Sequence, residues 1–306
     1  MRLAEVLLDP SRASSIDVPR LVDTLPSEVL CQASRLLRHV ADTATVAVRI
    51  GRALANRPTH TLSGTEKATC VATQIVDALQ FRGHLRDAFR LTSSLPVHSL
   101  RPTMMYNMAR AGMVPADSTR AELRRVLALA PRTTFTKLYG WWAVDGDTAA
   151  IQTYISAFIA AERRPRTSST TALLRANVVA GRAYLALAKR DSAAALSQLL
   201  AAKDTLHECW YDNRLALAQL LTAGRRYPEA GERLERRWPG TTSCSNGFDD
   251  VIWTIERARV FERLGRRDEA AANYAFVVDA WRTADPELQP YVRESRAAIT
   301  RLNGIR

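Results

Sequence analysis

One short phrase recurs along the chain and constrains its fold more than any other feature. It consists of a small or basic residue, a charged or polar residue, and then alanine-rich apolar positions at helical spacing. A small residue can end one helix, and a following Asp, Ser or Thr can cap the next. The phrase therefore predicts tight turns between paired helices. The first residues of the seven phrases are Ala41, Gly83, Ala116, Gly146, Arg190, Arg225 and Gly265.

Side chains of similar size recur at fixed distances from these predicted turns, which follow one another at steps of 30 to 44 residues. Such steps scatter around the length of a helix-pair repeat. Compact residues dominate seven positions before each turn: Ser34, Val76, Ala109, Tyr139, Ala183, Ala218 and Ala258. They also dominate five positions after it: Val46, Ala88, Ala121, Ile151, Ala195, Ala230 and Ala270. Large apolar residues are common nine positions after it: Ile50, Thr92, Arg125, Ile155, Leu199, Leu234 and Tyr274.

This layout resembles the tetratricopeptide repeat. The last repeat carries the likeness best, with Ala258, Phe261, Gly265, Ala270 and Tyr274. The resemblance implies an all-α fold, a right-handed α-solenoid of about seven degenerate helix-turn-helix repeats. The alternative is an irregular helical bundle whose alanine content imitates the period.

The chain also departs from the family pattern. Arg125 and Arg237 occupy places that are usually apolar, and Arg182 and Arg257 lie where the first helix of a repeat normally packs. The proline that ends the second helix in the family is mostly absent. These departures make the repeats degenerate, and they leave the register of individual repeats open.

The pattern predicts three regions. Residues 1–27 form an N-terminal leader or cap, since residues 9–27 are rich in Pro, Ser and Asp, and residues 28–282 form the repeat array. Residues 283–306 form a C-terminal capping helix, because the last repeat of an array needs a cover for its apolar face. The apolar residues of that helix are Leu288, Val292, Ile299 and Leu302.

The tail from Ala258 to Leu302 resembles the C-terminal repeat arrays of bacterial signalling regulators and protein kinases. Glu262-Arg263-Leu264-Gly265 and Ala284-Asp285-Pro286-Glu287-Leu288 carry that likeness. No kinase, winged-helix or receiver motif occurs in the sequence. Any effector domain that works with this chain is therefore expected elsewhere, outside this sequence.

Repeats of this family bind peptides or partner proteins on the concave face of their first helices. Carried across repeat by repeat, the resemblance implies groove positions of mixed amide, aromatic and charged character, suited to an extended or acidic peptide. These positions are Thr73, Asp77, Tyr106, Arg110, Lys137, Asn177, Tyr184, Asp212, Gln219, Arg259 and Arg263. Of the adjacent pair Trp141-Trp142, one indole is expected in the core and the other toward the groove.

The residues show no catalytic or metal-binding constellation. Phosphate-loop, GxSxG, HExxH and EF-hand motifs are absent. His207 and Cys209 are two residues apart and would point to different faces of a helix. Asp249-Asp250 could bind a cation or cap a helix, and the apolar residues that follow favour the cap. We therefore expect a non-enzymatic protein with no cofactor and no metal.

The net charge of +12 raises a second hypothesis, binding of nucleic acid or another polyanion. Arginines account for 39 of the 43 basic residues, a bias that a GC-rich genome also produces. Arg163, Arg164 and Arg166 lie in a polar loop and are the best candidates for a polyanion contact.

The N-terminal apolar run is too short for a signal peptide, and no stretch is apolar enough for a membrane span. The four cysteines show no disulfide spacing, so a reducing, cytoplasmic location is expected. The leading hypothesis is a protein–protein interaction scaffold in bacterial-type signalling or regulation. The remaining hypotheses are the polyanion binder, an enzyme on a helical scaffold, and an oligomerisation unit.

Overall fold

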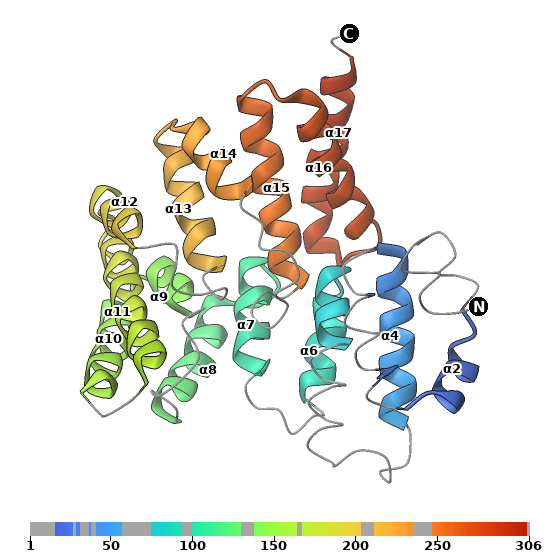
Figure 1. The fold of residues 1–306 in the computed structure, drawn as a ribbon, viewed down its shortest axis with the longest axis horizontal. Helices are drawn as coiled ribbons and strands as arrows, with labels where there is room; N and C mark the ends of the chain where they lie inside the picture. Colours follow the sequence, from blue (N-terminus) through green and yellow to red (C-terminus); the bar gives the residue numbers. More distant parts are fainter. Residues whose placement is uncertain are drawn as a thin grey trace. The chain divides into compact units, whose positions relative to one another are not determined.

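A computed structural model describes residues 16–26, 29–30, 37, 41–56, 75–93, 100–129, 138–163, 167–202, 211–235 and 247–304. These residues form α-helices and one short 3-10 helix, and no β-strand lies among them (Figure 1). The predicted all-α class is confirmed. Residues 75–81 are also helical and precede α6. The helices are α2 (Val18–Thr24), α4 (Ala41–Asn56), α6 (Leu85–Ser93), α7 (Leu100–Arg110), α8 (Ala116–Leu129), α9 (Tyr139–Asp145), α10 (Thr148–Glu162), α11 (Ser168–Ala188), α12 (Ser192–Ala201), α13 (Tyr211–Ala223), α14 (Tyr227–Glu235), α15 (Gly247–Arg263), α16 (Arg267–Ala280), η4 (Pro286–Leu288) and α17 (Gln289–Asn303).

The same turn joins helices at six places in the described chain. One residue adopts the left-handed conformation, with φ between 58° and 73°. The N–H of this residue donates to the carbonyl three residues earlier in the chain. The N–H of the following residue donates to the carbonyl five residues before that following residue. This pair of bonds is the Schellman motif, which satisfies the last carbonyls of a helix. The left-handed residues are Gly83, Gly112, Gly146, Arg190, Arg225 and Gly265.

Five of these six residues are predicted turn residues, so the recurring phrase marks real helix ends. The prediction at Ala116 is wrong, because that residue begins α8 and the turn residue is Gly112. The phrase at Ala41 lies at the start of α4, and the residues just before it fall outside the described part of the chain.

Burial around the turns follows the predicted spacing. All side chains seven positions before the six left-handed residues are buried: Val76, Met105, Tyr139, Ala183, Ala218 and Ala258. The side chains five positions after five of them are also buried: Ala88, Ile151, Ala195, Ala230 and Ala270. After Gly112 the turn is two residues longer, so Ala121 and Arg125 are exposed, whereas Thr119 and Leu123 are buried. The apparently misplaced Arg125 is thus a solvent-facing residue, and Leu123 fills the apolar place.

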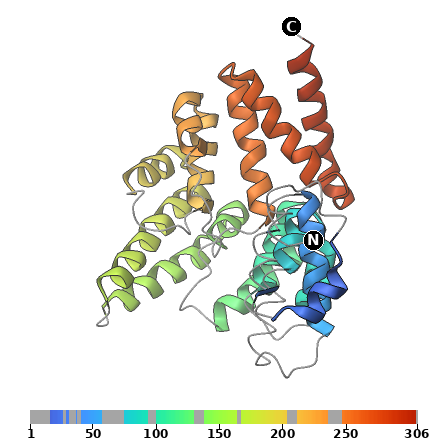
Figure 2. The ribbon, with the colours of Figure 1, turned by 45° about the vertical axis from the view of Figure 1, so that its right-hand side comes forward.

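The described residues fall into two compact units. One unit contains Val114–Ser245 and Arg259–Arg266. Within it each helix from α9 to α13 contacts the next helix in sequence, so that the run ends at α14, and α9 also contacts α11. The side-by-side packing of α10 and α11 is visible in both views (Figures 1 and 2).

Aromatic side chains form the core of this unit around α9 and α10. The Tyr139 ring stacks on Tyr184 at 5.7 Å between centroids and meets Tyr154 edge-on at 5.9 Å. Trp142 packs against Tyr154. Trp141 and Trp142 are both buried, so the prediction that one indole faces a groove is wrong. A seven-residue helix with two large indoles buries both of them, because the helices around it cover two of its sides.

The other unit contains Met1–Met113, Asn246–Ala258 and Arg267–Arg306. Here residues far apart in sequence are in contact. The Asp285 N–H donates to the Gly83 carbonyl at 3.0 Å, and the Asp285 carboxylate accepts from the Arg86 N–H at 3.1 Å. Arg86 also forms an ion pair with Glu287. The helix predicted near the C-terminal end is present as α17, which packs on α16.

Gly247, the first residue of α15, is a point of close approach in this unit. A Cβ atom there would lie within 2.6 Å of the backbone nitrogen of Phe81. Only glycine leaves room for the backbone at that distance. In a simple linear array each repeat contacts only its neighbours. The contacts of residues 81–86 with 247 and 279–287 therefore add long-range packing to the local hairpin pattern.

Candidate binding surface

The shared turn provides a common register for the first helices of the hairpins. Positions can be counted backward from the left-handed residue, and equivalent positions in different hairpins can then be compared. The predicted groove residues Asp77, Tyr184, Gln219 and Arg259 all lie six positions before their turns. With Gly112 as the turn residue, Tyr106 has the same position.

The structure places the predicted groove residues in three different environments. Four are buried: Asp77, Tyr106, Asn177 and Tyr184. Three are partly exposed, namely Arg110, Asp212 and Arg259, and two are exposed, namely Gln219 and Arg263. Thr73 and Lys137 lie outside the described residues.

The burial of Asn177 and Tyr184 has a clear cause. Tyr184 stacks on Tyr139, and the hydroxyl of Tyr139 donates to the backbone carbonyl of Asn177 at 3.4 Å. Burial raises the pKa of the Tyr139 hydroxyl well above its ordinary value, and raises that of Tyr154 to about 12. Both phenols are therefore neutral in the core, where the Tyr139 hydroxyl donates a hydrogen bond and the Tyr154 hydroxyl has no hydrogen-bond partner among the described residues. The predicted face of α11 at 177 and 184 packs inward and presents little surface to a partner.

A second pair of predicted residues forms an internal ion pair. The Arg110 guanidinium lies 2.7 Å from the Asp249 carboxylate, whose side chain is only 2% exposed. The same guanidinium lies over the rings of Tyr106 and Phe248 at 5.1 and 5.4 Å. Asp249 is in the first turn of α15, which begins at Gly247, so the expectation that the Asp249-Asp250 pair precedes and caps a helix is wrong. Asp249 instead anchors Arg110 within one unit of the protein.

The exposed side of α11 carries a different set of residues. Arg175, Arg182 and Lys189 are exposed and follow one another at seven-residue intervals. Two turns of helix separate residues seven apart, so these three cations lie on one face. The partly exposed apolar residues Val179 and Leu185 lie between them, together with Ala186. We call this set, Arg175, Val179, Arg182, Leu185, Ala186 and Lys189, the α11 stripe.

The α11 stripe occupies a position that is covered in other hairpins. Eight residues before the turn, the side chain is apolar and buried in four hairpins: Ile75, Met104, Leu138 and Leu217. In the last hairpin the equivalent Arg257 is partly buried and donates to Asn273. In α11 the equivalent residue is Arg182, which is exposed. The sequence showed Arg182 as a departure from the family pattern, and its seven-residue spacing from Arg175 and Lys189 was the available signal for this face.

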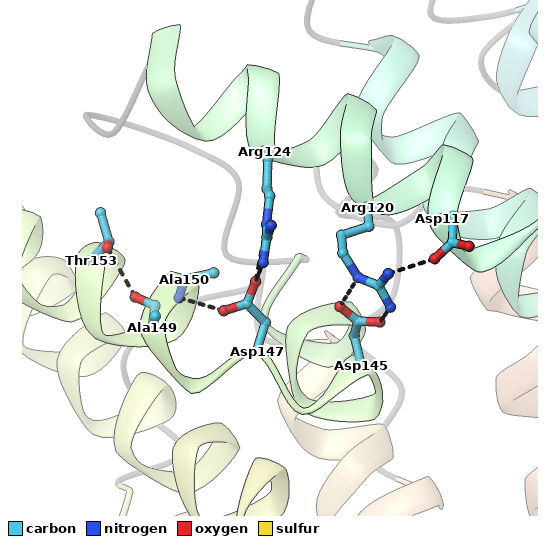
Figure 3. Close-up of polar contacts among 8 residues, drawn as sticks. All are labelled: Asp117, Arg120, Arg124, Asp145, Asp147, Ala149, Ala150 and Thr153. Carbon is cyan, nitrogen blue, oxygen red and sulfur yellow. Dashed lines mark hydrogen bonds and ion pairs between the residues drawn. The ribbon is translucent and has the colours of Figure 1, made fainter.

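Elsewhere on the same unit, exposed arginines are neutralised by neighbouring acids. On α8, Arg120 bonds to Asp145 at 2.8 Å and to Asp117 at 2.6 Å, and Arg124 reaches Asp147 at 2.9 Å (Figure 3). Hydrogen bonds that the Arg120 guanidinium donates to the Asp145 carboxylate raise the pKa of Arg120. These contacts fasten α8 to the turn between α9 and α10.

Asp147 has a double role at that turn. Its carboxylate accepts the N–H of Ala150 at 3.0 Å and thereby caps α10 (Figure 3). Burial alone would raise the pKa of Asp147, but the hydrogen bonds from Arg124 and Ala150 outweigh it and lower the pKa below its ordinary value. Asp191 caps α12 in the same way, accepting from Ala194 at 2.9 Å. The predicted capping role of the recurring phrase is confirmed at both turns.

The described residues contain no group of His, Cys, Asp and Glu side chains that could hold a metal ion. The four cysteines and His207 lie outside this part of the chain, as do Arg164 and Arg166 of the predicted polyanion loop; Arg163 is exposed. Among the helices that are described, none is both long and apolar enough to cross a bilayer.

Comparison of the chain with known protein families, curated proteins and solved structures finds no match.

Proposed function

We propose that this protein is a helical-repeat scaffold that binds a partner protein on the exposed faces of its first helices. The tetratricopeptide-like arrangement, a right-handed stack of about seven helix pairs with a C-terminal cap, is part of this proposal. Its setting would be cytoplasmic signalling or regulation of the bacterial type, as the resemblance of the tail implies. The role is one of recognition rather than catalysis.

The observation that carries the proposal is the repetition of one turn geometry at six helix ends. In the array that we propose, stacked hairpins bring equivalent first-helix positions side by side and create an extended surface. Contact between α9 and α11, the first helices of two successive hairpins, supports this arrangement. Gln219 is the predicted groove residue of α13 that is exposed on this surface. Such a surface suits recognition of another polypeptide, because it offers a row of side chains and few converging titratable groups.

A matched pair of photo-crosslinking positions tests the proposal. A benzophenone amino acid is placed at Gln219 on the first helix α13, or at the exposed Gln198 on the second helix α12. Irradiation in an extract of the source organism is expected to give a discrete protein adduct from position 219 and not from position 198. Identical adducts from both positions, or adducts with nucleic acid alone, would contradict the proposal.

A further inference from the structure

We propose that the α11 stripe is a docking surface for an acidic α-helical segment of a partner protein. This inference rests on the proposed scaffold function and names the surface and the chemistry of the partner. The surface differs from the groove positions that the family resemblance implied, since Asn177 and Tyr184 are buried. Its residues are Arg175, Val179, Arg182, Leu185, Ala186 and Lys189.

The α11 stripe occupies a packing position that other hairpins fill. Eight residues before the turn, neighbouring hairpins bury Leu138 and Leu217 against other parts of the protein. The α11 hairpin has exposed Arg182 at that place, flanked by partly exposed Val179 and Leu185. A helix face that carries apolar side chains, at a place where other hairpins are covered, is the kind of surface on which another helix packs. In α11 no part of the described chain covers it.

The α11 stripe also carries positive charge that the described residues do not neutralise. Arg182 and Lys189 have no ion pair or side-chain hydrogen bond among the described residues. Arg175, at the N-terminal end of the stripe, forms an ion pair with Glu162. Arg190, in the turn that follows, is also exposed and without a side-chain partner among these residues. The nearest acid in sequence, Asp191, is occupied as the cap of α12. Unpaired cations on one face complement acidic groups on a partner.

The seven-residue spacing of the three cations favours a helix as the partner. Residues seven apart on α11 are about 10.5 Å apart along its axis, and the three cations span about 21 Å. A second helix lying along α11 repeats its own side chains at the same interval. Acidic residues at every seventh position would therefore meet Arg175, Arg182 and Lys189 in turn. The apolar residues between them would meet Leu185 and Val179.

The mixture of charge and apolar surface favours a protein over a nucleic acid. Phosphate backbones are bound through cations and hydrogen-bond donors, and they gain little from aliphatic side chains. Val179, Leu185 and Ala186 occupy half of the stripe. A polypeptide with interleaved acids and leucines can use both kinds of contact. Nucleic-acid binding becomes a distinct outcome of the test.

The experiment uses the full chain and a defined probe. The probe is a synthetic helical peptide of about three heptads with Glu at every seventh position and Leu three and four residues later. A second peptide has Gln in place of each Glu, and an oligothymidine serves as the nucleic-acid arm. Affinities are measured by fluorescence anisotropy at two salt concentrations.

Two charge-reversed variants provide the contrast. R182E/K189E changes the stripe, and R293E/R296E makes the same change of charge on the exposed face of α17. We expect the Glu peptide to bind about tenfold more weakly to R182E/K189E, and to bind R293E/R296E like the wild type. Circular dichroism verifies folding, and R182Q/K189Q gives a milder second variant.

Three results would overturn the inference: equal binding of the Glu and Gln peptides, equal loss in both charge-reversed variants, or tighter stripe-dependent binding of oligothymidine. These results are separable from failure of the scaffold function. If crosslinking at position 219 captures a partner while the stripe variants bind the peptide normally, the scaffold stands and the assignment of the α11 stripe is wrong.

Discussion

Among single residues, the left-handed residue of each turn determines much of the backbone strain in that turn. Glycine adopts this conformation freely, whereas a residue with a Cβ atom is strained there. Four turns use glycine, but Arg190 and Arg225 stand at the other two with φ of 61° and 58°. These turns form because the local hydrogen bonds of the Schellman motif and the packing of the hairpins outweigh the strain.

Replacement of a left-handed glycine by alanine should therefore lower the free energy of unfolding, and replacement of a left-handed arginine by glycine should raise it. G146A should lower the free energy of unfolding by about 1 kcal/mol, since no atom lies within 4 Å of the added Cβ and strain alone acts. R190G should raise it by about 0.5 kcal/mol, because relief of strain exceeds the added flexibility of the unfolded chain. Urea denaturation monitored by circular dichroism measures both. A gain from G146A would contradict this account.

The carboxylate of Asp147 should make stability depend on pH. Its pKa is lowered in the folded state, so its contribution is present above the ordinary pKa of 3.8 and is lost as pH falls through the folded value. D147N keeps an acceptor for the cap of α10 but loses the charge paired with Arg124. We expect a deficit of about 0.5 kcal/mol at neutral pH that shrinks as the pH falls below 3.8 and through the lowered pKa of the folded state. Unfolding of both proteins across this range is the measurement, and a constant deficit would argue against the ion pair.

At the element scale, α8 shows how far sequence periodicity leads and where it stops. The phrase Ala116-Asp117-Ser118 looks like a cap after a turn, and it does begin α8. The preceding turn is longer than the others, however, and Pro115 lies between its left-handed Gly112 and the helix. Turns are local hydrogen-bonded motifs, so five of six were predictable. The extra length after Gly112 shifted the expected apolar positions by two residues.

That shift leads to a direct mutational contrast on α8. L123A should lower the free energy of unfolding by about 2–4 kcal/mol, because Leu123 is fully buried. R125A should leave it almost unchanged, because its ion pair with Glu122 is exposed. Chemical denaturation distinguishes the two. Equal losses of unfolding free energy in the two variants would contradict the assignment of Leu123, in place of Arg125, to the apolar position of this hairpin.

The candidate site was less predictable than the helices. Tyr184 is polar enough to suit a groove, but stacking on Tyr139 draws it into the core. Arg110 satisfies a buried carboxylate 139 residues away, a pairing that no local pattern reveals. The exposed position of Arg182 is evident only when equivalent positions of different hairpins are compared by counting back from their left-handed turn residues. Side-chain direction depends on tertiary neighbours, and a helical period alone leaves several faces open.

At the scale of the whole molecule, the unit that contains both ends of the described chain depends on contacts across long sequence separations. Asp285 acts as a distant cap for α6, since its carboxylate accepts the Arg86 N–H across 199 residues. Its own N–H bonds to Gly83, where an added Cβ would lie 2.5 Å from Ala284. Periodicity could not predict these contacts, because they join elements that no repeat spacing relates.

Removal of that distant cap should be visible in hydrogen exchange. D285A should accelerate exchange of the Arg86 amide by about fivefold or more, because the N–H loses its acceptor at the start of α6. D191A is the matched control, since it removes a local cap from α12 and should leave Arg86 unaffected. Exchange-detected mass spectrometry with overlapping peptides provides the measurement. Unchanged protection in D285A would show that α6 does not need this acceptor.

The bond between Gly83 and Asp285 also orders events during synthesis on the ribosome. Residue 83 leaves the exit tunnel long before residue 285 is translated, so the α6 hairpin must wait for its later partners. During that interval Phe81 and the rest of this apolar surface are open to chaperones and to other nascent chains. By contrast, the hairpins from α9 to α14 join neighbours in sequence and can mature as they emerge. Translation speed over the codons for residues 247–287 should therefore influence the yield of native protein more than speed over the codons for α9 to α14.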